Sequence, residues 1–391
     1  MRTRCGQKSV SICMAAGLVI LIGVRSGWAA AATVRDGLRP LAQDILDVVV
    51  KDQHQSAISV GEFVGQARFD TNAGQGIGED LKSLLEELRP GVVQRGAALT
   101  ISGRYAFVDE EKQNPQLKIV KVTAVILDQN DHRIDEKSIE IDSTKAIAQV
   151  MGVTAALPKD ASKVERNREL QKAVAKPQFY LEGTKIRSRA ESPYAIEILV
   201  KPLENPAQLT AQPRAPQDSA GEAFVDIKQN ELYEVKIYNE SERPVAVALT
   251  VDSLDVFHFS NDRGPDGRPQ FGFFILQPKG FKEAADSESA PSDGTLTIVG
   301  WHKSVAGREN FLSFLVTEHG KGAVSQPGVK ARGKVGVIAV QFSECRPLAK
   351  GAKAAAGNET GFGPPREVRQ KPVRYEVEPP HDFISVRYTR P

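Results

Sequence analysis

The six histidines are the first residues to weigh, because imidazole is a common metal ligand and proton shuttle. They are scattered along the 391-residue chain, with no HxH pair and no HExxH motif to hold one metal between two ligands. Folding alone could bring His258, His302 and His319 together. His258 alternates with Phe257 and Phe259, which is typical of a strand residue on the polar face of a sheet. We therefore expect no metal site.

Candidates for nucleophilic or acid–base chemistry are equally few. The chain has no GxSxG motif, and Cys345 ends an apolar strand pattern, which favours a buried thiol over a nucleophile. Asp252 and Asp255 are a close pair of carboxylates of the kind that hydrolyse glycosidic bonds. They keep one alternative open, a secreted hydrolase acting on a cell-wall or glycan substrate. No motif predicts a catalytic residue.

A glycine-rich segment would suit a phosphate-binding loop. Gly74, Gly76 and Gly78 form GxGxG without the further spaced glycine of dinucleotide sites, and the chain has no GK[ST] motif. We therefore predict a flexible loop, residues 72–78, leading into a helix. No cofactor is expected.

Aromatic residues gather on both sides of a polar loop at residues 261–270. Such a cluster is typical of a sheet core, and the alternative is an edge at which the loop and the aromatics meet a partner. The candidate binding edge consists of Phe257, His258, Phe259, Phe271 and Trp301.

The N-terminus has the layout of a secretory signal peptide over residues 1–32. A basic start is followed by an apolar run at 12–24 and by four alanines at 29–32. The apolar run is shorter than the ~20 residues of a membrane-spanning helix. We predict export to the periplasm or the extracellular space, with no transmembrane helix in the mature chain; retention of the segment as an anchor stays open.

The next stretch, residues 33–150, predicts an α/β layer with a mixed sheet. Apolar residues recur with helical spacing over 38–49 and 77–88, and strand patterns cover 57–64, 99–107, 117–127 and 134–141. The order of two helices and four strands suits a helix-covered sheet.

Several short motifs in this layer resemble a known module of the bacterial envelope. They are the segments Ile58-Ser-Val-Gly-Glu-Phe63, Gly76-Ile-Gly-Glu-Asp-Leu81 and Ile101-Ser-Gly-Arg-Tyr105, followed by a hairpin. Their order is similar to the periplasmic domain of the CsgG, FlgO and TolB N-terminal families. The whole chain also loosely resembles secreted planctomycete-type proteins of unassigned function. The resemblance implies an envelope protein that binds other proteins and is not an enzyme.

The remaining chain predicts a helical linker at 151–190, an antiparallel β-sandwich at 191–345 and a basic tail at 346–391. The tail ends in a strand pattern at 383–389, which we expect to be added to the sandwich. The fold class is therefore α+β. The net charge of +2 shows no concentrated basic surface, so no nucleic-acid partner is expected. The sequence predicts an exported, non-catalytic envelope protein that binds a protein or a surface polymer.

Overall fold

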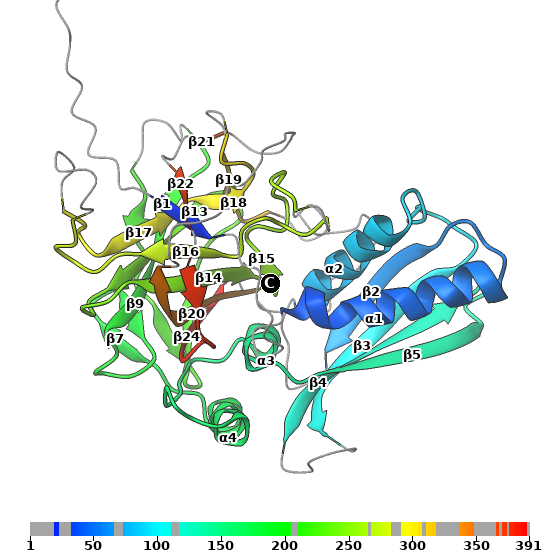
Figure 1. The fold of residues 1–391 in the computed structure, drawn as a ribbon, viewed down its shortest axis with the longest axis horizontal. Helices are drawn as coiled ribbons and strands as arrows, with labels where there is room; N and C mark the ends of the chain where they lie inside the picture. The colour runs from blue at the N-terminus through cyan, green and yellow to red at the C-terminus, as the bar shows by residue number, and fades with distance from the viewer. Residues whose placement is uncertain are drawn as a thin grey trace, which may run out of the picture.

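The computed structural model describes residues 19–22, 33–65, 73–110, 117–204, 210–264, 267–282, 291–306, 310–317, 336–347, 365–366, 370–373 and 375–388. Its chain folds into a four-stranded layer built from the N-terminal part and two larger sheets built from the rest (Figure 1). The protein is thus mixed α and β, with strands predominating, as the α+β prediction requires.

The four-stranded layer is a sheet covered by two helices. Its strands follow the order β2 (Ser59–Gly65), β3 (Thr100–Asp109), β4 (Lys118–Leu127) and β5 (Arg133–Ile141). The first pair is parallel and the other two are antiparallel, so the sheet is mixed. Helices α1 (Val34–Asp47) and α2 (Ala73–Leu88) lie across one face (Figure 1), and a short π-helix, Val48–Asp52, continues α1. This arrangement buries the predicted apolar faces of both helices.

Helix α2 begins earlier than the sequence suggested. The segment from Ala73 to Gly78 is helical, so the prediction of a loop through residue 78 is wrong there, and residues 66–72 lie outside the described part. Close packing explains the glycines. A Cβ on Gly74 would overlap the carbonyl oxygen of Phe63, and one on Gly76 would overlap the backbone of Asp252. Glycine therefore lets the helix touch its neighbours, despite its low helix propensity.

The two larger sheets pack face to face on a shared apolar core. One sheet has the main order β11-β12-β24-β20-β14-β16-β1-β22, and the other has β18-β19-β13-β9-β8-β7. Their bounds, with the smaller strands that flank them, are β7 (Tyr180–Glu182), β8 (Lys185–Arg187), β9 (Tyr194–Pro202), β10 (Gln212–Pro213), β11 (Gln217–Ser219), β12 (Glu222–Val225), β13 (Glu231–Asn239), β14 (Val245–Val251), β15 (Leu254–Asp255), β16 (Phe273–Leu276), β17 (Thr295–Ile298), β18 (Gly300–His302), β19 (Phe311–Leu315), β20 (Gly336–Pro347), β21 (Pro365–Arg366), β22 (Gln370–Val373), β23 (Tyr375–Val377) and β24 (Asp382–Tyr388).

The terminal strand expected at 383–389 is present as β24 and, as predicted, is added to the sheets of the sandwich. It lies inside the sheet, antiparallel to β20 on one side and parallel to β12 on the other. In the described part, the strand pairs within the predicted sandwich range, residues 191–345, are antiparallel; the parallel pair involves the tail strand, for which no direction was predicted. A strand that arrives from the chain end by a long connection can enter a sheet in either direction.

The range 151–190, expected to be a helical linker, is only partly helical. It follows α3 (Thr144–Met151) and contains α4 (Lys163–Ala175), the short strand β6 (Ala155–Ala156), β7 and β8. Strand β6 pairs with β24, and β7 and β8 extend the second sheet. Helix α3 lies between the four-stranded layer and the large sheets (Figure 1). The segment therefore ties the parts of the molecule together.

Residues Val19–Ile22 form strand β1, which pairs with β16 and with β22. They belong to the apolar run of the predicted signal peptide, most of which lies outside the described residues. Cleavage after Ala31 or Ala32 would remove this strand.

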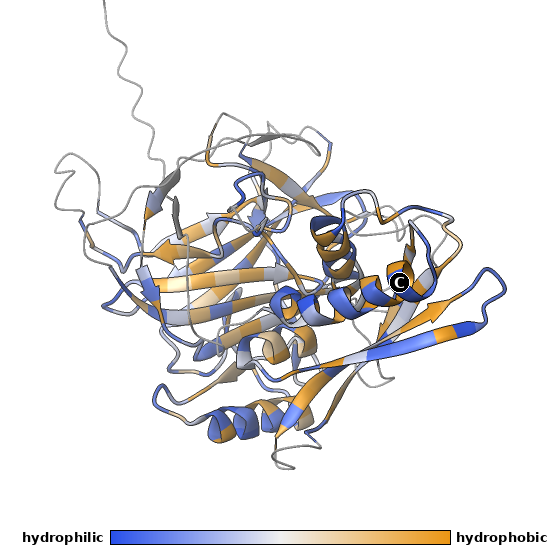
Figure 2. Cartoon of the chain, turned by 45° about the vertical axis from the view of Figure 1, so that its right-hand side comes forward, coloured by the Kyte–Doolittle hydropathy of each residue, from blue (hydrophilic) through white to orange (hydrophobic). Residues whose placement is uncertain are grey.

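Hydropathy follows the same architecture. Figure 2 shows hydrophobic residues along the strands of the large sheets, whereas α4 is mainly hydrophilic. Among the described helices, none combines the length and the apolar character needed to cross a bilayer.

Candidate functional site

The segment at residues 256–260 forms consecutive turns, so the prediction of a strand at 256–259 is wrong. The Oδ1 atom of Asp255 accepts a hydrogen bond from the Phe257 amide at 2.9 Å, and the His258 amide donates to the carbonyl of Asp255. These local bonds replace pairing with a neighbouring strand. As a result, Phe257 enters the core of the large sheets, whereas His258 faces the four-stranded layer.

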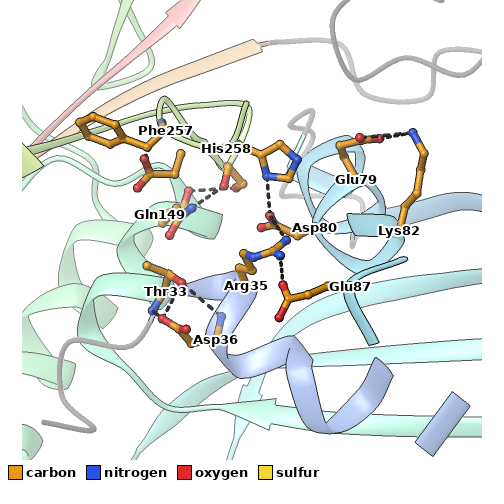
Figure 3. A network of polar contacts seen from close by, with 12 residues as sticks. Thr33, Arg35, Asp36, Glu79, Asp80, Lys82, Glu87, Gln149, Phe257 and His258 are labelled. Atoms are coloured by element: carbon orange, nitrogen blue, oxygen red, sulfur yellow. Dashed lines mark hydrogen bonds and ion pairs between the residues drawn. The ribbon is translucent and has the colours of Figure 1, made fainter. Parts of the chain in front are cut away.

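His258 belongs to a buried ionic contact, here called the junction, between the large sheets and helices α1 and α2 (Figure 3). Its Nδ1 lies 3.0 Å from Oδ1 of Asp80 on α2. Arg35 on α1 lies 3.9 Å from the same oxygen and 2.6 Å from Glu87, which also pairs with Arg39 at 2.6 Å. The His258–Asp80 hydrogen bond and the arginine ion pairs thereby join three elements that are distant in sequence.

The β14–β15 turn completes the junction. Asp252 and Ser253 both have positive φ angles, and the turn that they form packs on Gly76 of α2. The Gln149 side chain of α3 donates to the Ser253 carbonyl, and the Ser253 hydroxyl donates to the Gln149 carbonyl at 3.2 Å. This reciprocal pair fixes α3 against the turn.

A carboxyl group and an ammonium group lie close to this turn. Burial raises the pKa of Asp255 to about 6, and the charge of Lys145 acts in the opposite direction. Burial also lowers the pKa of Lys145, whose ammonium lies 4.3 Å from the ring centroid of Phe273. Asp255 is thus the member of the proposed acid pair whose proton affinity suits acid catalysis near neutral pH.

The other carboxylate of the pair, Asp252, is hydrogen-bonded within the fold. Its Oδ1 accepts the Val337 amide at 2.9 Å, and its Oδ2 accepts the Tyr388 hydroxyl at 2.7 Å. Both oxygens of the carboxylate therefore hold the turn against β20 and β24.

The five residues of the candidate binding edge occupy three different settings. Phe257 and Phe271 are buried in the core, with ring centroids 6.4 Å apart, and His258 is buried in the junction. Phe259 and Trp301 retain some exposure and contact each other edge to face at 5.3 Å. Only these last two present aromatic surface to a partner, and their binding role stays a prediction.

The proposed three-histidine cluster is not assembled by the described part of the chain. His302 is fully buried and its Nδ1 lies 3.0 Å from the Ser260 hydroxyl, whereas His258 faces Asp80 and His319 is outside the described residues. Among the described residues, no group of three or more His, Cys, Asp or Glu side chains is arranged to hold a metal.

A second site, here called the cleft, lies at one end of the large sheets. It has a volume of about 600 Å³ and is lined from four segments, at 189–194, 241–244, 344–347 and 378–382, together with Lys159. Strand register explains why these segments meet. Tyr194 lies opposite Asn239, Val245 lies opposite Glu344, and Phe342 lies opposite Asp382, so the ends of five strands (β9, β13, β14, β20 and β24) share one rim.

The floor of the cleft contains titratable groups with displaced proton affinities. Burial raises the pKa of Asp382 to about 6 and lowers the pKa of His381 to about 4. Burial also raises the pKa values of Tyr194 and Cys345 to about 12, so the thiol stays protonated and poorly nucleophilic. Perturbed groups gathered around a concavity are a physical mark of functional sites.

Two polar atoms at this floor lack a partner at normal hydrogen-bond geometry in the part of the chain that the structure describes, although the Ser188 hydroxyl lies close enough to Asp382 to lower the pKa of its carboxyl. They are Nε2 of His381 and Oδ1 of Asp382, on side chains with 7% and 2% relative exposure. The other carboxylate oxygen of Asp382 accepts the Ser192 hydroxyl at 2.9 Å. An unsatisfied buried polar atom costs about 1–3 kcal/mol, and a partner that reaches the atom offsets part of that cost.

Sequence reasoning missed the cleft because its residues are far apart along the chain. One signal was available. Proline follows Ser192, Arg243 and Arg346 and precedes His381, in each case beside the end of a strand pattern. These prolines mark strand ends, but the order of strands in the sheets decides which ends meet.

No protein-family model, curated protein or solved structure matches this chain. The resemblance to the envelope module therefore stays a prediction from motif order.

Proposed function

We propose that this chain is an exported, non-catalytic protein of the cell envelope that binds a protein or a surface polymer through the cleft. The observation that carries the proposal is the pair of buried, unpartnered polar atoms on His381 and Asp382 at the floor of a concavity of about 600 Å³. Small-ligand sites have volumes of about 300–1,000 Å³ and place a few polar groups in a mostly apolar wall. The predicted signal peptide and the module resemblance support the envelope.

Retention from an envelope extract tests this function. The full chain and a variant with Arg189→Glu and Arg243→Glu would be immobilised and exposed to the extract. Both arginines are exposed residues of the cleft rim, so the variant should keep its fold. We expect the wild-type chain to retain a defined species and the variant to lose it. Equal retention by both proteins would contradict binding through the cleft.

The alternative function, a hydrolase that uses Asp252 and Asp255, has one observation in its favour, the raised pKa of Asp255. A screen of glycan and cell-wall substrates tests it with Asp255→Asn. Asp252→Asn is less informative because that carboxylate holds the Tyr388 hydroxyl and the Val337 amide. Turnover by the wild-type chain that Asp255→Asn abolishes would replace the binding function with catalysis.

A further inference from the structure

The charges on the rim of the cleft show what kind of ligand would fit. Two of the lining cations are already neutralised within the protein, because Lys159 pairs with Glu344 and Arg346 pairs with Glu376. Arg189, Arg243, Glu242 and Glu378 are exposed, and within the described residues none of these four forms an ion pair. The rim therefore has two exposed charges of each sign outside these ion pairs, and inside the protein Arg189 acts through its charge on Asp382 and Arg243 on Glu344.

A balanced rim of this kind discriminates by charge pattern. A ligand with charges of one sign only would be repelled by two of the rim residues as strongly as it is attracted by the other two. A ligand with both signs can pair with each set in turn. The lining also includes Pro193, Pro244 and Tyr194, which offer apolar surface beside the charged residues to a short apolar stretch of the ligand.

We infer that the cleft binds a zwitterion, specifically a short peptide with a free amino end and a free carboxyl end. This assignment rests on the cleft being the binding site proposed above. The carboxylate of the peptide would pair with Arg189 and Arg243, whose guanidinium groups are suited to two-point recognition of carboxylates. The ammonium would pair with Glu242 and Glu378.

Four peptides that differ only at their ends test the charge pattern. Trialanine, N-acetyl-trialanine, trialanine amide and the doubly blocked peptide would each be titrated into the full chain at pH 7.5 by calorimetry. We expect trialanine to bind at least ten times more tightly than any blocked form. Equal binding by all four peptides, or binding by none, would overturn the zwitterion assignment.

Two rim variants then assign the ends. Arg189→Gln with Arg243→Gln should weaken trialanine at least tenfold and leave the weaker binding of the amide unchanged. Glu242→Gln with Glu378→Gln should weaken trialanine similarly and leave the acetylated peptide unchanged. Arg133→Gln, an exposed change on β5, is the control and should alter none of these affinities. Loss of trialanine binding in the control, or its retention in both rim variants, would contradict the assignment.

The two proposals fail in different ways. In one outcome, trialanine does not bind, but the Arg189→Glu, Arg243→Glu variant fails to retain the species that the wild-type chain retains from the envelope extract. The cleft is then a binding site for a ligand of another chemical class. If the rim variant retains that species and trialanine also fails to bind, both the site and its ligand class are wrong.

Discussion

At the scale of single residues, buried histidine and aspartate side chains lie together in two separate places. His258 and Asp80 are paired at 3.0 Å between the layer and the large sheets, where the contact joins elements. His381 and Asp382 lie at the floor of the cleft, each with one unpartnered atom within the described structure. Buried pairs of the first kind mainly fix one arrangement of the chain, whereas unpartnered atoms of the second kind call for a ligand.

The opposite pKa shifts of His381 and Asp382 give a pH prediction. The pKa of Asp382 is raised to about 6, so its contribution favours folding at low pH and is lost as the pH rises from 4 to 6. The pKa of His381 is lowered to about 4, so its contribution is lost as the pH falls from 6.5 to 4. In the wild-type chain, the two groups therefore change the free energy of unfolding with pH in opposite directions.

The substitution Asp382→Asn removes the pH dependence that the Asp382 carboxyl gives to the free energy of unfolding. The free energy of unfolding of the variant should gain up to about 3 kcal/mol relative to the wild type between pH 4 and pH 7. Urea unfolding at several pH values measures the difference. Asp131→Asn, at an exposed turn, is the control for loss of one carboxylate. Parallel stability curves for Asp382→Asn and wild type would contradict the burial argument.

At the scale of elements, glycine decides how closely α2 approaches its neighbours. A Cβ on Gly76 would overlap the backbone of Asp252, whereas one on Gly78 would meet Gly61 and Phe63 at ordinary contact distances of 3.6 and 3.7 Å. Gly76→Ala should therefore destabilise the protein by about 1–3 kcal/mol, because the helix and the turn must separate. Gly78→Ala, on the same helix, should be neutral or stabilise by up to about 1 kcal/mol. Thermal unfolding that ranks the two variants in the opposite order would exclude this packing.

The terminal strand β24 is the second element that organises the molecule. Ile384, Val386 and Tyr388 lie in the core of the large sheets, and Phe383 lies in the core of the four-stranded layer. Burying each such side chain stabilises the fold by about 1.5–3 kcal/mol.

Deleting residues 380–391 should therefore abolish cooperative unfolding of the large sheets at 50 mM and at 1 M NaCl alike. Salt has little effect because the contacts that are lost are mainly apolar, with one ion pair between Arg387 and Glu222. Deletion of 389–391 alone is the control and should leave the transition in place. A truncated chain that unfolds normally and loses only low-salt binding to an anionic polymer would show that the tail acts through charge.

The sequence predicted those elements whose pattern is local. The apolar spacing of α1 identified that helix correctly, because burial repeats with the period of a helix. The alternation of β14 also identified a strand, but all seven of its residues are buried, so both of its faces are covered. The alternation at Phe257–Phe259 gave a wrong prediction, because it too is a local pattern. It suits a strand, but the side chain of Asp255 accepts the Phe257 amide and turns the chain.

At the scale of the whole molecule, the layer and the large sheets share contacts that no local pattern reveals. Phe383 of β24 packs in the core of the layer, and the Gln341 side chain of β20 donates to the Lys145 carbonyl of α3 at 3.0 Å. The cleft likewise depends on strand order, which brings residues 189–194 beside 378–382. Strand order is set by long-range packing, so neither the junction nor the cleft was predictable from sequence spacing.

The central claim is that the cleft is the binding site, and hydrogen exchange tests it most directly. The full chain would be exchanged with and without the ligand fraction recovered from the envelope extract. We predict added protection in the four segments at 189–194, 241–244, 344–347 and 378–382, with no change in β5. Protection confined to the surroundings of Phe259 and Trp301, or no added protection in any of the four segments, would contradict the account.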